Sequence, residues 1–199
     1  MESKSLIVGV IFGLLIGLIL GYSIVPKASE YETRIAAFEN QIATLNSQIA
    51  SLNTRNLEFI AVSFSRVDDT SSLICTWIDK ANSTIDVAVY SFTQYSIGDA
   101  LVAAKARGVN VRVVMEHDTI SDSGSEYSWL QSKGISIRTD SSEGLMHNKF
   151  FVIDGSIVGT GSFNWTKSAE NDNDENLLIV RSESLANKYL NEFNYLWRN

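Results

Sequence analysis

One stretch of the sequence gathers the side chains that phosphate chemistry uses. His147, Lys149 and Asp154 follow the pattern H-x-K-x4-D, and Ser162 and Asn164 come shortly afterwards. An imidazole can attack phosphorus or move a proton near neutral pH, and a lysine ammonium is a point charge suited to phosphate oxygens. Hydroxyl and carboxamide groups add neutral donors that stabilise developing charge. The pattern therefore predicts a phosphoryl-transfer site.

A hairpin is expected to position these groups. Residues two apart on a strand face the same side, so His147 and Lys149 should lie side by side. Asp154-Gly155 is a strong turn signal between predicted strands at 149–153 and 157–160.

The return strand should bring Ser162 and Asn164 beside this pair. Glu175, at the start of the following predicted strand, could accept a hydrogen bond from the imidazole and favour its cationic form. The competing interpretation is a β-hairpin with incidental polar residues.

The rest of this region alternates between strands and helices. Gly108 and Gly134 are typical helix stops, and Ser182 is a helix start. The predicted strands are 84–91, 109–116, 135–138 and 176–181, and the predicted helices are 71–81, 97–107, 125–133 and the segment after Ser182. This order predicts an α/β sandwich, a mixed β-sheet flanked by helices, as one domain over 59–199.

The run MHNKFFVIDGSIVGTGSFNWT, followed by NDENLLIV, resembles the HKD motif of the phospholipase D superfamily. It is most similar to the small single-motif members, the bacterial nuclease type and the mitochondrial cardiolipin hydrolase or Zucchini type. The resemblance extends from about Asn56 to the C-terminus and includes the segments VAVYSFT and GVNVRVVME. It implies a phospholipase D-like fold and a phosphodiesterase activity.

The resemblance also implies a role for each motif residue. His147 matches the nucleophile, and Glu175 matches the acidic residue that orients it. Asp154 and Gly161 match structural positions of the motif. The positions that match phosphate contacts are Lys149, Ser162 and Asn164.

The family normally combines two motifs in one active site, and this chain carries one. His117 is not a second motif, because no lysine or GSxN sequence follows it. The resemblance therefore implies a homodimer in which two chains share the site, unless the site is defective. One His147 would form a phosphohistidine and the other would protonate the leaving group. Neither metal nor cofactor is expected, and His117 and Glu116 are either substrate contacts or loop residues.

The N-terminal segment predicts a membrane anchor. Residues 6–25 form an uncharged apolar run of twenty residues, which as a helix would span roughly 30 Å, the thickness of the hydrocarbon core. A cleaved signal peptide is the alternative, but its apolar core is usually shorter. A single-pass membrane protein follows, with the catalytic domain expected on the extracytoplasmic side because the short N-terminal tail is easily kept inside.

Residues 27–58 predict a coiled-coil stalk. Apolar residues recur at spacings of three and four, which is typical of a coiled coil, and Ile at a positions with Leu at d positions favours a parallel two-stranded coil. The alternative is one amphipathic helix packed on its own domain. The predicted seam consists of Ala28, Tyr31, Ile35, Phe38, Ile42, Leu45, Ile49, Leu52, Asn56 and Phe59.

Charge bears on the substrate. The segment from Phe59 to Asn199 contains 12 Lys and Arg against 18 Asp and Glu, a net charge of −6. This acidity disfavours broad electrostatic attraction to nucleic acid backbones. Family resemblance favours a nuclease acting on DNA or RNA, and the predicted anchor keeps phospholipid headgroups as the alternative substrate. A non-catalytic membrane scaffold is the third interpretation.

Overall fold

The computed structural model describes the backbone of residues 2–24, 28–55, 57–140 and 144–198, and the side chains of these residues except 2–8, 20, 23–24, 28–29 and 50–55. The chain divides into two compact units, Met1–Leu52 and Asn53–Asn199, which are treated separately.

The first unit contains helices α1 (Glu2–Ile24) and α2 (Ala28–Arg55). The described apolar side chains of α1, such as Phe12 and Leu18, are exposed. Within the part of the chain that the structure describes, no helix has the length and apolarity that crossing a membrane requires. The predicted span 6–25 falls partly outside the described residues, and the anchor stays a prediction.

Helix α2 carries an uncovered apolar stripe. The described seam residues are all exposed: Tyr31, Ile35, Phe38, Ile42, Leu45 and Ile49. The coiled coil therefore stays a prediction, and Asn56 lies outside the described residues. The placement of Phe59 in the seam was wrong, because α2 ends at Arg55 and strand β1 begins at Glu58.

The second unit is built on a sheet of mixed direction. Its described strands are β1 (Glu58–Phe64), β2 (Thr84–Val89), β3 (Asn110–Met115), β4 (Ser136–Thr139), β5 (Lys149–Ile153), β6 (Ile157–Gly161) and β7 (Asn176–Arg181). They are ordered β1-β7-β6-β5-β2-β3-β4. The neighbours β2–β3 and β3–β4 are parallel, and all other neighbours are antiparallel.

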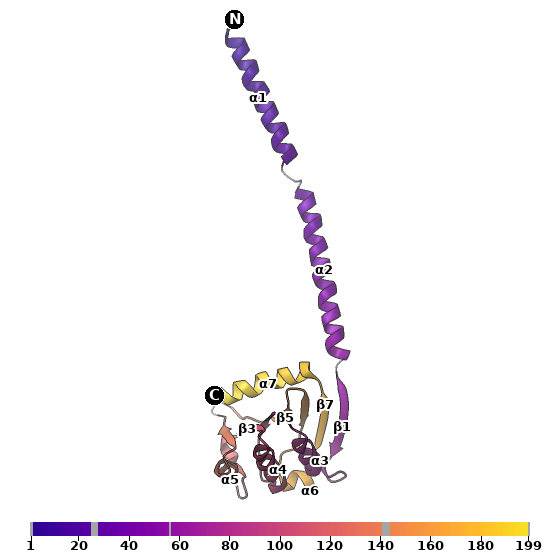
Figure 1. Ribbon diagram of the computed structural model, residues 1–199, viewed down its shortest axis with the longest axis vertical. Coiled ribbons are helices and arrows are strands. Elements are labelled where there is room, and N and C mark those ends of the chain that lie inside the picture. Colours follow the sequence, from indigo (N-terminus) through magenta and orange to yellow (C-terminus); the bar gives the residue numbers. More distant parts are fainter. Residues whose placement is uncertain (1, 25–27, 56, 141–143, 199) are drawn as a thin grey trace. The chain divides into compact units, whose positions relative to one another are not determined.

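Helices cover both faces of the sheet, which confirms the predicted α/β sandwich (Figure 1). One face carries α3 (Thr70–Asp79), α4 (Tyr95–Ala106), α5 (Tyr127–Ser132) and α6 (Lys167–Asn171), and α7 (Glu183–Arg198) covers the other. A short 3-10 helix, η1 (His117–Thr119), follows β3.

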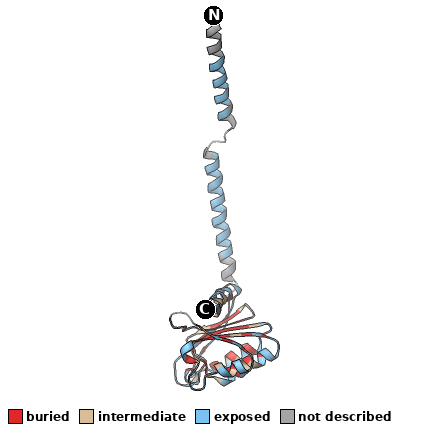
Figure 2. Ribbon diagram, turned by 90° about the vertical axis from the view of Figure 1, so that its left-hand side faces the viewer, coloured by how far each residue is buried: buried red, intermediate tan, exposed pale blue. Residues whose placement is uncertain are grey.

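Side-chain alternation along the strands produces the two cores. In β5, Phe151 and Ile153 join the larger cluster under α3, α4 and α5, whereas Phe150 and Val152 join the cluster under α7. In Figure 2 the buried segments of the second unit, in red, lie along its strands and helices. The sequence predicted β5 and β7 with their observed bounds and the other interior strands to within about two residues, but it missed β1.

Asp154 joins the turn of the hairpin to the start of β2. Its carboxylate accepts five hydrogen bonds, from the backbone N–H groups of Asn82, Ser83 and Thr84 and from the side chains of Asn82 and Ser83. Burial opposes ionisation, but these donors outweigh it and lower the pKa of Asp154 to about 2. The carboxylate therefore holds β5 in place against β2.

We expect Asp154→Asn to destabilise the fold by about 1–2 kcal/mol at pH 7, because the amide cannot replace a carboxylate that accepts on both oxygens. Asn tolerates the positive φ of 50° at this position, so backbone strain should not add to the loss. The folded pKa lies below the ordinary value of 3.8, so the stabilisation is complete above about pH 4 and is lost as pH falls toward 2.

Urea unfolding of both proteins between pH 7 and pH 2 measures this difference. Asp122→Asn, at an exposed position, is the control and should change the free energy of unfolding little at any pH. A gap between wild type and Asp154→Asn that stays constant down to pH 2 would contradict the role given to the carboxylate.

Candidate active site

The strand directions bring the predicted site residues to one edge of the sheet, the edge at which β5 and β7 begin and β2 and β6 end. Because β5 runs antiparallel to β2 and β6, its first residue lies beside the last residues of both neighbours. The start of β7 reaches the same edge, since β7 is antiparallel to β6. This edge therefore carries His147 and Lys149, Ser162 and Asn164, and Glu175. Asp154 lies at the opposite edge, where β5 ends.

Lys149 is the most constrained of these side chains. It is 9% exposed, and its Nζ donates to the carbonyl oxygen of His147 at 2.7 Å. The same ammonium lies over the ring of Tyr90, 5.1 Å from its centroid, which adds a cation–π contact. Burial lowers the pKa of Lys149, and the charge of Glu175 partly opposes this shift. The ammonium is thus partly desolvated, which strengthens its attraction for an anionic ligand.

His147 is exposed next to this buried charge. Its imidazole packs edge-on against Tyr90, with ring centroids 4.8 Å apart. Tyr90 thus contacts both members of the H-x-K pair, and its backbone N–H donates to the carbonyl of Asn148 between them. Sequence reasoning missed Tyr90, which lies inside the predicted strand 84–91 and directly after the observed β2.

The segment after β6 is held from two sides. On one side, the backbone N–H groups of Ser162 and Phe163 donate to the carbonyl of Asn176, and Ser162 Oγ accepts from the Asn176 backbone N–H at 3.1 Å. On the other side, Trp165 accepts from Thr93 and Gln94. These bonds fix the Ser162–Asn164 segment between β7 and the extension of β2.

Gly161 makes this close packing possible. A Cβ atom at position 161 would lie 2.1 Å from the carbonyl oxygen of Asn176, a distance that no side chain tolerates. The glycine lets β6 approach β7 and turn Ser162 toward the edge.

Asn164 contains a buried acceptor that folding alone leaves unsatisfied. Its Oδ1 has no hydrogen-bond partner among the described residues. Leaving a buried acceptor unpaired costs about 1–3 kcal/mol. An asparagine that lowers stability at this position is expected to serve function instead.

Glu175 is bonded to Ser65, directly after β1, rather than to the imidazole. Its backbone exchanges hydrogen bonds with Ser65, and its Oε1 accepts from Asn173 Nδ2 at 3.2 Å. Within the described residues no hydrogen bond joins Glu175 to His147. The side chain lines a cavity of about 300 Å³ beside Phe64 and Val67.

Glu116 is a positioning residue that sequence reasoning considered only as a substrate contact or a loop residue. It is buried, and its Oε2 accepts the backbone N–H of Met146 at 2.7 Å. The carboxylate thereby fixes the residue that precedes His147 to the end of β3. His117, in contrast, is exposed in η1. Among the described residues no three His, Cys, Asp or Glu side chains gather as metal ligands do.

Known proteins share this fold and this motif region. Residues 74–197 match the family described as cardiolipin synthase, PLD-like domain. The crystal structure of a phospholipase D family member, Nuc from Salmonella typhimurium, is 35% identical with a TM-score of 0.66, and the alignment covers 69% of this chain and 93% of that one. The chain belongs to the phospholipase D superfamily, a family of hydrolases that act on phosphodiester bonds.

Two curated relatives carry informative names. The mitochondrial cardiolipin hydrolase of Xenopus tropicalis is 37% identical over 131 residues, which cover 66% of this chain and 62% of that protein. A phospholipase D of Rickettsia conorii is 34% identical over 131 residues, with 66% of each chain covered. The match thus spans less than two thirds of the length of the cardiolipin hydrolase.

The electrostatic link between Glu175 and Lys149 gives a prediction. In Glu175→Gln the attraction that favours the ammonium is lost, so the pKa of Lys149 should fall below its wild-type value. The measurement is an NMR titration of the Lys149 side chain in protein labelled with ¹³C-lysine. Asp174→Asn, which removes the neighbouring exposed carboxylate that pairs with Arg66, should leave that pKa unchanged. An unchanged or higher pKa in Glu175→Gln would refute the link.

Proposed function

We propose that this chain hydrolyses phosphodiester bonds through a phosphohistidine formed on His147. The observation that carries the proposal is the exposed imidazole of His147 beside the buried ammonium of Lys149, at an edge that also carries Ser162 and Asn164. A nucleophile open to substrate and a partly desolvated cation are what attack on a phosphodiester requires.

The reaction proceeds in two displacements. A nitrogen of His147 attacks phosphorus, a P–N bond forms, and the P–O bond to the leaving group breaks. The leaving oxygen takes a proton from the His147 of a second chain. That second imidazole then accepts a proton from water, whose oxygen attacks phosphorus and breaks the P–N bond.

Lys149, Ser162 and Asn164 hold the phosphoryl oxygens during both steps. The Lys149 ammonium now donates to the carbonyl of His147 and can exchange this neutral acceptor for a charged phosphoryl oxygen. Glu175 acts on the site electrostatically, because its charge helps to keep Lys149 protonated.

A homodimer completes the site in this proposal. The chain has one H-x-K pair, and the two-step reaction needs a nucleophile and a separate acid. The exposed apolar stripe of α2 supports a parallel pairing of two chains, because a stripe of this kind is covered when it packs against its copy. Residues 6–25 would anchor the pair in a membrane, with the catalytic unit on the extracytoplasmic side.

Nucleic acid is the proposed substrate. The similarity to Nuc covers 93% of that protein, so nearly the whole of Nuc corresponds to the catalytic unit of this chain. Phospholipid is the second candidate, supported by the sequence similarity to mitochondrial cardiolipin hydrolases and by the predicted anchor. A purely structural scaffold is disfavoured, because the polar residues at the site edge include an unpaired buried acceptor.

We expect His147→Ala in the full chain to lower phosphodiesterase activity by at least about 10³-fold, because the nucleophile is removed. Single-stranded and double-stranded DNA, RNA and cardiolipin vesicles are the substrates, each with and without chelator. His117→Ala removes the exposed second histidine of the chain, which is not followed by the lysine of an H-x-K pair, and should retain activity. Alkaline quenching with ³²P-labelled substrate should trap label on wild type only. Label that persists on His147→Ala would refute His147 as the nucleophile. Hydrolysis of lipid alone would refute nucleic acid as the substrate.

The shared site makes a second prediction. When wild-type and His147→Ala chains are mixed in equal amounts and allowed to exchange, activity per wild-type chain should fall to about half, because a mixed dimer has only one His147 imidazole. Lys188→Gln, at an exposed position in α7, replaces His147→Ala in the control mixture and should leave activity unchanged. Full activity per wild-type chain in both mixtures would show that each chain works alone.

A further inference from the structure

A pocket beside α4 is separate from the phosphodiesterase residues. It has a volume of about 350 Å³ and is lined by Tyr95, Asp99, Gly124, Ser125, Glu126 and Trp129. Tyr95 and Asp99 belong to α4, and Trp129 belongs to α5. The pocket is joined to the segment after β2, because the backbone N–H of Glu126 donates to the carbonyl of Phe92.

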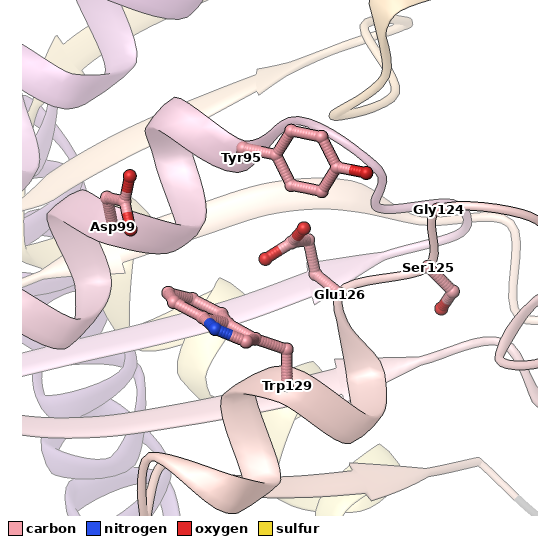
Figure 3. Close-up of a pocket in the computed structure, with 6 residues that line it drawn as sticks. All are labelled: Tyr95, Asp99, Gly124, Ser125, Glu126 and Trp129. Carbon is pink, nitrogen blue, oxygen red and sulfur yellow. The ribbon is translucent and has the colours of Figure 1, made fainter.

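One lining residue of the pocket, Glu126, has a buried carboxylate oxygen that lacks a partner. Glu126 is only 2% exposed, and its Oε2 has no hydrogen-bond partner among the described residues. In Figure 3 this carboxylate points into the space between Tyr95 and Trp129. An unpaired buried carboxylate is costly, so the position is expected to receive a donor or a cation from outside.

Neighbouring residues increase the demand for positive charge. Asp99 brings a second carboxylate to the same pocket, one helical turn after Tyr95. Burial raises the pKa of Glu126, and the charge of Asp99 raises it further. No ion pair joins either carboxylate to a basic side chain within the described residues.

The helix sequence makes room for this carboxylate. Gly98 is buried within α4, and a Cβ atom there would lie 2.6 Å from Glu126 Oε2 and 3.2 Å from the ring of Trp129. A glycine inside a helix costs about 1 kcal/mol relative to alanine. The cost is explained if the Glu126 carboxylate must pack closely against α4.

The aromatic walls define the kind of cation. Ring faces attract organic cations, and both rings already receive a lysine: Lys167 lies 5.1 Å from the centroid of Tyr95 and Lys133 lies 5.7 Å from that of Trp129. A divalent metal ion would instead need more oxygen ligands than two carboxylates supply. The unpaired Oε2 further favours a cation that donates hydrogen bonds.

We propose that this pocket binds a primary ammonium group, which donates to Glu126 Oε2 and lies between the rings of Tyr95 and Trp129. Its source is either a small soluble amine or the headgroup of an amine-bearing phospholipid. The site uses none of the residues proposed for phosphodiester hydrolysis, so the two proposals stand or fall separately.

Three small probes separate charge from hydrogen bonding. The indole N–H resonance of Trp129 in the full chain, assigned with Trp129→Phe, reports binding at pH 7.5. Ethanolamine, which is charged and donates, should bind with a millimolar or lower Kd. Tetramethylammonium, which is charged but cannot donate, should bind about tenfold more weakly, and neutral ethylene glycol should not bind.

Matched variants test the residues. Glu126→Gln keeps the shape and removes the charge, and it should weaken ethanolamine binding by about tenfold or more. Asp99→Asn, at an exposed position, should weaken it by a few fold and serves if Glu126→Gln does not fold. Lys167→Gln removes a competing positive charge and should tighten binding. The proposal would be overturned if Glu126→Gln and Asp99→Asn both bound ethanolamine as tightly as wild type does. It would also be overturned if ethylene glycol bound as tightly as ethanolamine, if ethanolamine did not shift the Trp129 resonance, or if Ca²⁺ shifted it more.

Vesicles distinguish the two sources. Competition with ethanolamine by phosphatidylethanolamine vesicles but not by phosphatidylcholine vesicles would support the site and identify a lipid headgroup as its ligand. Binding of ethanolamine without competition by either would support the site and identify a soluble amine. Equal competition by both vesicles would contradict recognition of a primary ammonium.

Discussion

The register of β5 between β2 and β6 is the constraint on which the site depends. Lys149 pairs with Val89 at one end of β5 and Ile153 pairs with Ile85 near the other. A slip of one residue would move Lys149 to the face of the sheet under α7 and exchange the apolar side chains of β5 between the two cores. Both ends of the strand are therefore fastened, by the Asp154 carboxylate at the turn and by Glu116 through Met146 before His147.

This fastening allows a charged group to be kept in a place that folding does not favour. The Lys149 ammonium is buried, donates to the carbonyl of His147 and lies over the ring of Tyr90. The Glu175 carboxylate interacts with it only electrostatically. Asn164 Oδ1 and Glu126 Oε2 are likewise buried and unpaired within the described structure. The core side chains from Ile85 to Ile179, which are almost fully buried, supply the stability that offsets these losses. This unfavourable polar burial is found at the motif edge of the sheet and at the pocket beside α4, two places where a ligand can compensate for it.

Much of this arrangement could be predicted from local sequence signals. Alternating apolar residues and the Asp154-Gly155 turn are enough to predict β5 and β6, because register and face follow from a period of two. The motif residues could be assembled because each stands at a strand end. The placement of Phe59 was wrong because an edge strand with exposed Phe59, Val62 and Phe64 looks like a continued helical stripe. Tyr90 and the tie from Glu116 to Met146 could not be predicted, since both depend on contacts between segments far apart in the sequence.

The pairing of β1 with β7 has a consequence for how the protein is made. Of the described strands, β1 is the first to leave the ribosome and β7 is the last. The hydrogen bonds between Ser65 and Glu175, which position Glu175 beside the site, therefore form only when synthesis is nearly complete. Contacts so distant in sequence form slowly, because a long loop must close first. Until then, β1 exposes both of its backbone edges together with its phenylalanine side chains, and the nascent chain is at its most prone to aggregate.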